Sequence, residues 1–172
     1  MGTLQRLAYE LAVNTCARAS NLYRLGKMHE KEGGLTWKPF KGQDISYEIG
    51  DENALEVSIP ITPQLRTAID AAPSGNLIYV AIEKGTPFMS AKRFSQWLVK
   101  ARKTAKLPNE CVTHGLRKVE ATRLAEAGVG EFMLMSIMGW TNPSQAHVYT
   151  EKANRKEMAE KGMRVLDGEE QI

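Results

Sequence analysis

Apolar residues near the start of the chain recur with the period of a helix. The stripe comprises Leu4, Leu7, Ala8, Leu11 and Ala12. Intervals of three and four residues place them on one face of an amphipathic helix that begins almost at the first residue. A second short helix is expected to end at Gly26, and Arg18 falls at the junction between the two. On local sequence alone, Arg18 is interpreted as a helix arginine bordering the core or the solvent.

The middle of the chain changes to period-two alternation, which is typical of strands. The stretches 35–39, 45–49 and 55–61 have this character, and a glycine-containing turn at 50–53 separates the last two. They predict a small antiparallel sheet of about three strands. The short apolar run 77–82 predicts one further strand.

Helical periodicity then returns and continues almost to the end of the chain. Thr62 before Pro63 is a good helix start, and Ser90 is a good cap for a long helix with Phe94 and Trp97 on its apolar side. Further helices are expected at 114–127 (capped by Thr113), at 131–138, from Pro143 onwards (capped by Asn142) and at about 153–166. The pattern as a whole predicts an α+β fold that is mainly helical, with a small antiparallel sheet.

Composition limits the class of protein. With 172 residues and 42% apolar content, the chain is one ordinary domain with a sizeable core. Cys16 and Cys111 have neither disulfide-framework nor zinc-site spacing, so reduced thiols are expected. No apolar run reaches membrane-spanning length, and a signal-peptide pattern is missing at the first residues. We therefore expect a cytoplasmic protein.

The charge distribution permits a nucleic-acid partner without requiring one. The formal net charge is +3, and a basic cluster lies on the helix that follows Ser90. Its candidate DNA-binding residues are Lys92, Arg93, Lys100, Arg102 and Lys103. The periodicity places these side chains opposite the apolar face, where a solvated helix surface is the simpler interpretation.

The residues that could carry chemistry are concentrated between Thr113 and Thr150. His114 and Arg117 are three apart in the first turn of a helix, where free backbone NH groups already favour an anion. Trp140 follows the next helix, and Tyr149 lies near the end of the one after. These four side chains can converge on one small anion. The sequence has no glycine-rich phosphate loop and no paired metal-binding carboxylates, so we expect neither a metal nor a cofactor.

Five short motifs, in order, resemble those of the tyrosine recombinases, the phage-integrase family. They are C-A-R-A-S-N-L around Arg18, K-P-F-K-G around Lys41, T-H-G-L-R-K around His114 and Arg117, M-G-W at Trp140, and H-V-Y-T at Tyr149. H-x-x-R alone is weak evidence, whereas the ordered set is specific. The stretches H-G-L-R-K and A-E-A-G look most like integrases of bacterial phages and integrative elements.

The resemblance implies a role for each matching residue. Tyr149 would attack a DNA phosphodiester, leaving a 3′-phosphotyrosine and a free 5′-hydroxyl. Arg18 and Arg117 would bind the non-bridging oxygens, and Lys41 would protonate the departing 5′-oxygen. Lys38 is the alternative to Lys41, because the predicted hairpin carries an insertion of roughly ten residues relative to a short hairpin.

The remaining two side chains would complete the phosphate pocket. His114 can accept the phenol proton, which a tyrosine with a pKa of about 10 retains at neutral pH. Trp140 has a single donor, its indole NH, and can act as much by packing as by bonding. The family usually has glycine and an acidic residue where this chain has Ala17 and Asn21, so the support of Arg18 is expected to differ.

The resemblance also implies partners and a domain organisation. We expect residues 1–172 to be a single catalytic domain without the N-terminal DNA-clamping domain usual in the family. Double-stranded DNA would be the substrate, with a homotetramer on DNA and a monomer without it. The last helix would dock on a neighbouring protomer. Two alternatives remain: a type IB topoisomerase, which shares the chemistry, and a catalytically idle DNA-binding remnant.

Overall fold

The protein is mainly helical, with two small antiparallel sheets, as expected for an α+β fold. The computed structural model describes residues 2–40, 55–73, 76–82, 85–153 and 155–166. Its helices are α1 (Leu4–Thr15), α2 (Ala19–Leu22), α3 (Pro63–Ala71), α4 (Ala91–Thr104), α5 (Thr113–Glu126), α6 (Glu131–Met138), α7 (Pro143–Thr150) and α8 (Arg155–Leu166), with a 3₁₀ turn at Lys27–His29. Its strands are β1 (Glu30–Lys31), β2 (Gly34–Trp37), β3 (Val57–Pro60), β4 (Ala81–Ile82) and β5 (Thr86–Pro87).

The larger sheet has the order β1-β2-β3. Leu35 pairs with Ile59 and Trp37 with Val57 across antiparallel strands, so the apolar residues of both strands face the core. The predicted strand 45–49 lies outside the described residues. Among the described residues, the third strand of this sheet is β1, which the alternation did not indicate because it has only two residues. The predicted strand 77–82 is reduced to β4, which pairs with β5.

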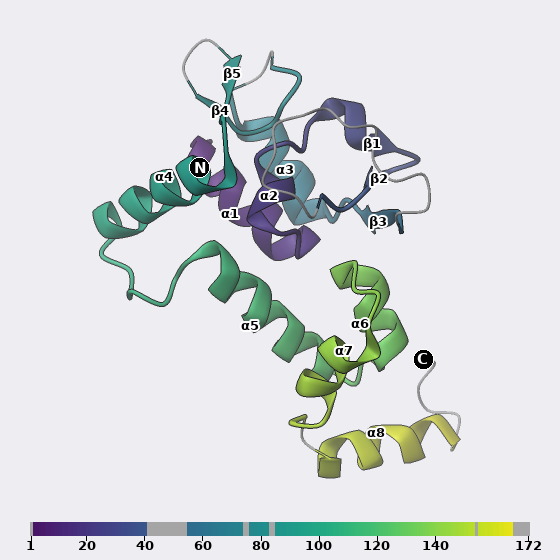
Figure 1. The fold of residues 1–172 in the computed structure, drawn as a ribbon. Helices are drawn as coiled ribbons and strands as arrows, with labels where there is room; N and C mark the ends of the chain where they lie inside the picture. Colours follow the sequence, from purple (N-terminus) through teal and green to yellow (C-terminus); the bar gives the residue numbers. More distant parts are fainter. Residues whose placement is uncertain (1, 41–54, 74–75, 83–84, 154, 167–172) are drawn as a thin grey trace.

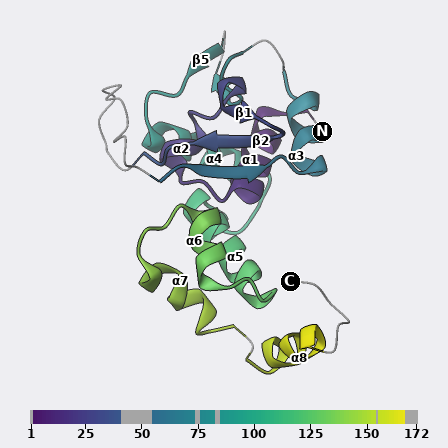
Figure 2. The same ribbon diagram turned by 90° about the vertical axis from the view of Figure 1, so that its right-hand side faces the viewer.

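Two groups of buried side chains form the core. The first fills the space between α1, α2, α4 and the larger sheet, and its fully buried members include Leu11, Leu22 and Phe94. The second lies among α5, α6 and α7 and includes Ala121 and Ala146, whose small side chains let the helices approach closely. The elements that carry the first group form the upper part of the ribbon in Figures 1 and 2, and those that carry the second form the lower part.

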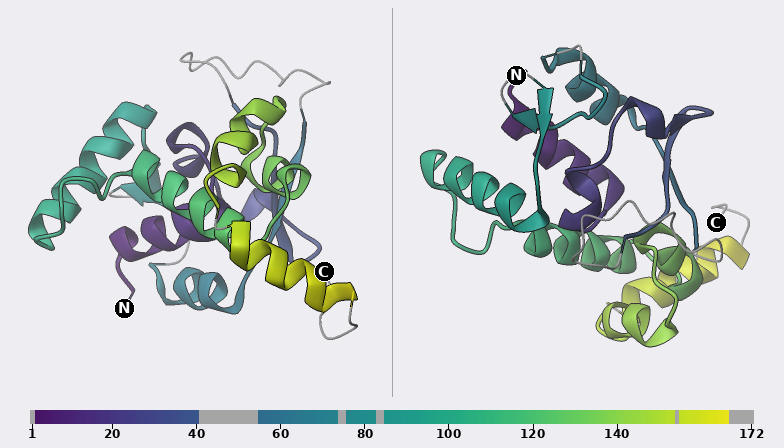
Figure 3. Two further views of the ribbon diagram at one scale, coloured as in Figure 1. Left: turned by 90° about the horizontal axis from the view of Figure 1, so that it is seen from below. Right: turned by 45° about the horizontal axis from the view of Figure 1, so that its top comes forward.

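Helix α5 connects the two parts. It runs beside the end of α1, between α4 and the α6–α7 pair, as Figure 3 shows. It begins at Thr113 with Val112 as its cap, one residue earlier than predicted, and no side chain caps it. The three other predicted caps are as expected, with Thr62, Ser90 and Asn142 accepting from backbone NH groups. Helix α8 lies at the far end, beyond α7.

Three single side chains have notable environments. Met133 is exposed because α6 turns this position outward, whereas Met138 on the same helix is buried. His29 is half-buried, with its Nδ1 accepting from the Gly26 NH. Burial lowers the pKa of His29. Arg102 was expected on the exposed face of α4 and is buried, donating from Nη1 to the Asn109 carbonyl.

Candidate active site

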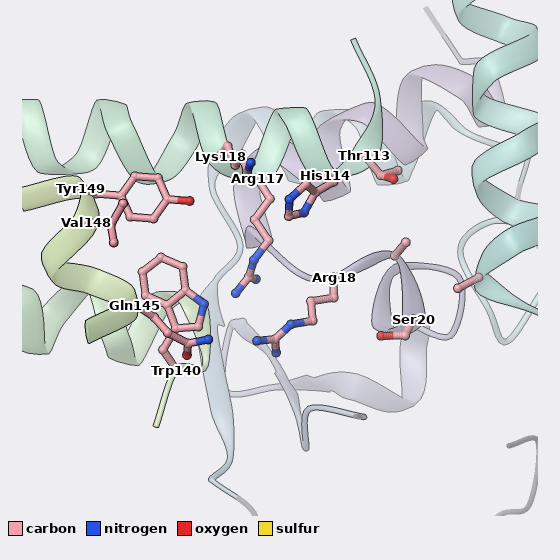
Figure 4. A pocket seen from close by; sticks show the side chains of 12 residues that line it. Arg18, Ser20, Thr113, His114, Arg117, Lys118, Trp140, Gln145, Val148 and Tyr149 are labelled. Atoms are coloured by element: carbon pink, nitrogen blue, oxygen red, sulfur yellow. The ribbon is translucent and has the colours of Figure 1, made fainter. Parts of the chain in front are cut away.

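A cavity of about 600 Å³ lies where the two parts of the molecule meet. Helices α2, α5 and α7 and the turn after α6 all contribute to its wall (Figure 4). The lining residues are Arg18, Ala19, Ser20, Ala91, Thr113, His114, Arg117, Lys118, Trp140, Gln145, Val148 and Tyr149. All five described residues of the predicted site, at positions 18, 114, 117, 140 and 149, are among them.

Arg18 is placed by a sharp turn between α1 and α2. Cys16 ends α1 in the left-handed conformation, with φ 52°, so the chain reverses and Arg18 becomes the cap residue of α2. Asn21, at the position where the family usually has an acid, is buried and accepts from the Phe40 NH at 2.9 Å. The side chain of Ser20 donates to the Phe40 carbonyl at 3.3 Å. Helix α2 therefore holds both Arg18 and the backbone of residue 40.

Arg117 is held by the carboxyl ends of two helices. Its Nη1 donates to the carbonyl of Cys16, which caps α1, and its Nη2 donates to the carbonyl of Met138, the last residue of α6, at 2.6 Å. The last carbonyls of a helix have no partner within the helix, and they carry the negative end of its dipole. These two carbonyls therefore fix the Arg117 guanidinium and favour its positive charge.

Burial and a neighbouring cation oppose the positive charge of Arg117 without removing it. Its pKa is lowered to about 10, mainly by burial and secondarily by the positive charge of the nearby Arg18. At neutral pH the guanidinium stays protonated. Two guanidiniums facing one cavity repel each other in the absence of an anion, so the site is electrostatically prepared for a negatively charged group.

Trp140 and Tyr149 form the opposite wall. Their rings stack with centroids 5.5 Å apart and an interplanar angle of 16°. Trp140 is buried and lies under Arg117, whose guanidinium carbon is 5.5 Å from the ring centroid. The Tyr149 hydroxyl points toward Arg117 and His114 (Figure 4). The stack thus directs the phenol into the cavity.

His114 and the basic residues of α4 occupy more open positions. His114 is exposed in the first turn of α5, at the rim of the cavity. Lys92 and Arg93 are exposed and follow Ala91, which lines the cavity, and Lys100 and Lys103 are exposed farther along α4. Arg102 no longer belongs with them, because its burial and its bond to Asn109 make it a structural residue.

Lys41 and Lys38 are the two candidates for the general acid. Lys41 lies outside the described residues, directly after the anchored Phe40. Lys38 is exposed and is not among the residues that line the cavity. The choice between the two lysines stays open.

Sequence reasoning missed seven lining residues, and four of them are polar: Ser20, Thr113, Lys118 and Gln145. Gln145 could have been found, because it lies one helical turn before Tyr149 and so faces the same side of α7. Lys118 directly follows Arg117 and adds a cation to the wall. Ser20 and Thr113 gave no signal beyond being good capping residues.

Metal-binding clusters and membrane-spanning helices are absent from the described part of the chain. No three or more His, Cys, Asp or Glu side chains there are arranged to hold a metal ion. No helix in the described ranges is long and apolar enough to cross a membrane.

Gly139 supports the wall, and its substitution is expected to destabilise the protein. It ends α6 with φ 59°, and a Cβ at this position would lie 2.8 Å from Val57 Cγ2 and 3.2 Å from Pro39 Cγ. Gly139→Ala should lower the free energy of unfolding by about 1–2 kcal/mol from the backbone conformation alone, measured by urea denaturation. Gly162→Ala is the matched control, because nothing lies within 4 Å of that Cβ. Equal stability of the two variants would contradict the expected strain at Gly139.

Comparison with known proteins identifies the family and relatives of the fold. The model of the phage integrase family matches residues 2–156, and the chain belongs to that family. Among solved structures, a Tn1549 transposon integrase in complex with transposon right end DNA is 19% identical, with a TM-score of 0.70 over 95% of this chain and 59% of that one. A lambda integrase dimer bound to a COC′ core site is 21% identical, with a TM-score of 0.65 over 88% of this chain and 53% of that one.

The catalytic core of lambda integrase alone is 20% identical, with a TM-score of 0.57, and the match covers 79% of both chains. Lambda and Tn1549 integrases thus share the fold of this chain, which spans about half the length of the longer structures it matches. No curated protein matches the sequence.

Proposed function

We propose that residues 1–172 form the catalytic domain of a site-specific DNA recombinase that cleaves and rejoins DNA through a 3′-phosphotyrosine. One observation carries the proposal: Arg18, His114, Arg117, Trp140 and Tyr149, from separate parts of the sequence, line one cavity. The tyrosine hydroxyl faces a buried guanidinium across that cavity. Membership of the phage integrase family supports the assignment.

The proposed reaction is a phosphoryl transfer to the phenol. Tyr149 Oη attacks the phosphorus of a DNA phosphodiester, and its proton passes to His114. The P–Oη bond forms while the bond from phosphorus to the 5′-oxygen breaks, and that oxygen takes a proton from Lys41, or from Lys38 in its place. Rejoining reverses these steps with a different 5′-hydroxyl as the attacking group, so no nucleotide cofactor is consumed.

The two arginines stabilise the transition state of this reaction. Negative charge accumulates on the non-bridging oxygens as Tyr149 attacks, and planar guanidiniums donate to two oxygens at once. Arg117 needs no reorganisation, because the Cys16 and Met138 carbonyls already hold it. Trp140 contributes its stacking on Tyr149 and its indole NH.

The proposed substrate is double-stranded DNA, with a homotetramer as the active assembly and a monomer in its absence. Support comes from relatives: lambda integrase has been solved as a dimer on a core site and as a tetramer on a Holliday junction. Docking of α8 on a neighbouring protomer belongs to the same proposal, and its exposed Met163 and Leu166 suit it. The protein would act in the cytoplasm of a bacterial host, on the nucleoid.

A nicked-duplex experiment tests the proposal against both alternatives. A pool of duplexes with randomised sequence around the nick traps the covalent intermediate, because the short 5′-fragment diffuses away. A recombinase gives a protein–DNA adduct and joins two sites. A topoisomerase gives an adduct and relaxes supercoiled plasmid without joining sites. An idle remnant binds the pool and gives no adduct, which would overturn the proposal.

The affinity for DNA is expected to fall steeply with salt, and α4 should contribute to this dependence. Each phosphate contact contributes about one unit of slope to a plot of log K against log salt. Lys100→Ala should therefore reduce the slope by about 1, measured by fluorescence anisotropy between about 50 and 200 mM salt. Arg102→Ala is the matched control and should keep the slope, because Arg102 is buried. A flat salt response of the wild type would contradict phosphate contact.

A further inference from the structure

Helix α6 contacts α7 at two places, at its own first residue and through the turn that follows its last residue. After α6, the turn at Gly139 brings Trp140 onto the Tyr149 ring. At the start of α6, one carboxylate oxygen of Glu131 has two partners on α7. It lies 2.8 Å from His147 Nδ1 and accepts from Thr150 Oγ1 at 2.9 Å.

The two partners of Glu131 flank Tyr149 in the sequence. His147 and Thr150 are three apart, so they share a face of α7. Tyr149 points elsewhere, since an α-helix turns by about 100° per residue. Glu131 therefore holds the rotational setting of α7 about its own axis without touching the tyrosine.

We propose that Glu131 is a positioning residue for Tyr149: by bonding both His147 and Thr150, it sets the rotation of α7 and so the place of the Tyr149 hydroxyl in the cavity. The inference rests on the proposed role of Tyr149 as the nucleophile. We call the three side chains Glu131, His147 and Thr150 the α6–α7 clamp.

A small rotation of α7 has a large effect at the hydroxyl. A tyrosine hydroxyl lies on the order of 6 Å from the helix axis, so a turn of about 10° moves it by about 1 Å. A misplacement of about 1 Å in a reacting group can slow a reaction by about 100-fold. None of the three clamp residues lines the cavity. Loss of the clamp should therefore change the position of the Tyr149 hydroxyl and leave the arginines and His114 of the phosphate pocket in place.

The clamp also has a defined pH dependence. The hydrogen bond to Glu131 raises the pKa of His147, and the charge of Glu151 on α7 adds to this. The bond to His147 lowers the pKa of Glu131, and the bond to Thr150 lowers it further. The pair is therefore charged on both sides at pH values above the lowered pKa of Glu131 and below the raised pKa of His147. As pH rises through the latter, the imidazole loses its charge, and the bond weakens because only its acceptor, the Glu131 carboxylate, is still charged.

Four variants separate the clamp from general effects. Glu131→Ala removes both bonds, and Glu131→Gln keeps the shape without the charge. His147→Asn retains a donor near the Nδ1 position but cannot titrate. Glu126→Gln is the matched control, because it removes one exposed negative charge from α5.

Nuclear magnetic resonance of the free protein tests the effect of the clamp on Tyr149 without DNA. Tyrosine rings are labelled with ¹³C, and the Tyr149 signal is identified among the five tyrosines by its loss in Tyr149→Phe. In the wild type, the pH titration of this signal should include a step whose midpoint lies above the ordinary pKa of histidine. The step should move to lower pH in Glu131→Gln and vanish in His147→Asn. An identical Tyr149 signal and titration in all variants would overturn the proposal.

Single-turnover cleavage of the nicked-duplex pool gives the second measurement. Glu131→Ala should react about 10- to 100-fold more slowly than the wild type, with DNA affinity and melting temperature close to those of Glu126→Gln. His147→Asn should keep most of the wild-type rate and lose the pH dependence that the clamp adds. A rate for Glu131→Ala within twofold of the wild type would contradict the clamp. Absence of cleavage by the wild type would instead contradict the role of Tyr149, leaving the resonance result to decide on the clamp.

Discussion

Replacing Tyr149 with phenylalanine is expected to abolish covalent attachment of the protein to nicked DNA. The substitution removes the attacking oxygen and leaves the ring that stacks on Trp140, so the cavity keeps its wall. Loss of an enzyme nucleophile typically lowers the rate by more than about 10⁴-fold. The adduct, measured by denaturing gel electrophoresis under single-turnover conditions, should therefore fall below detection.

A matched control separates chemistry from binding. Tyr9 is an exposed tyrosine on α1, and Tyr9→Phe should react at the wild-type rate. Both variants should bind the duplex pool within about twofold of the wild type, since the phenol is a small part of a phosphate-dominated interface. An adduct formed by Tyr149→Phe would show that another residue attacks the DNA.

Substitution of Arg117 is expected to have the second largest effect. Arg117→Lys keeps a charge but loses the planar fork that reaches the Cys16 and Met138 carbonyls together with a phosphate. Loss of one preorganised donor costs about 10²- to 10³-fold in rate, measured as the rate of adduct formation. Arg117→Ala should also lower the free energy of unfolding by about 1–3 kcal/mol, because two buried carbonyls lose their partner.

Arg123 provides the comparison for Arg117. It lies on the same helix, is exposed and pairs with Glu120 at 2.9 Å. Arg123→Lys should leave both the rate and the stability close to wild type, because Arg123 does not line the cavity and a lysine can keep the ion pair with Glu120. Equal rates for the two lysine variants would contradict the proposed grip of Arg117 on the phosphate.

Local sequence patterns predicted much of the fold because the relevant forces are local. The caps at Thr62, Ser90 and Asn142 could be predicted because each side chain bonds a backbone NH group of the helix that it begins. The ordered motifs also identified the five described residues that line the cavity. Neither result required knowledge of which helices touch.

What the sequence could not predict depends on contacts between distant segments. The Cys16 and Met138 carbonyls that hold Arg117 are backbone groups, and a carbonyl has no sequence signature. The clamp joins Glu131 to His147, 16 residues away, and becomes visible only when α6 lies beside α7. Arg102 was misplaced because helical period alone does not show that the Asn109 carbonyl returns to meet it.

Mapping the residue attached to DNA tests the central claim most directly. Wild-type adduct with the nicked-duplex pool is digested with trypsin and nuclease, and the nucleotide-bearing peptide is identified by mass spectrometry. Cleavage after Arg123 and Lys152 yields a peptide of residues 124–152 in which Tyr149 is the sole tyrosine. We predict a 3′-linked nucleotide on Tyr149. A linkage to any other residue, a 5′ linkage, or no adduct on DNA that the protein demonstrably binds would contradict the account.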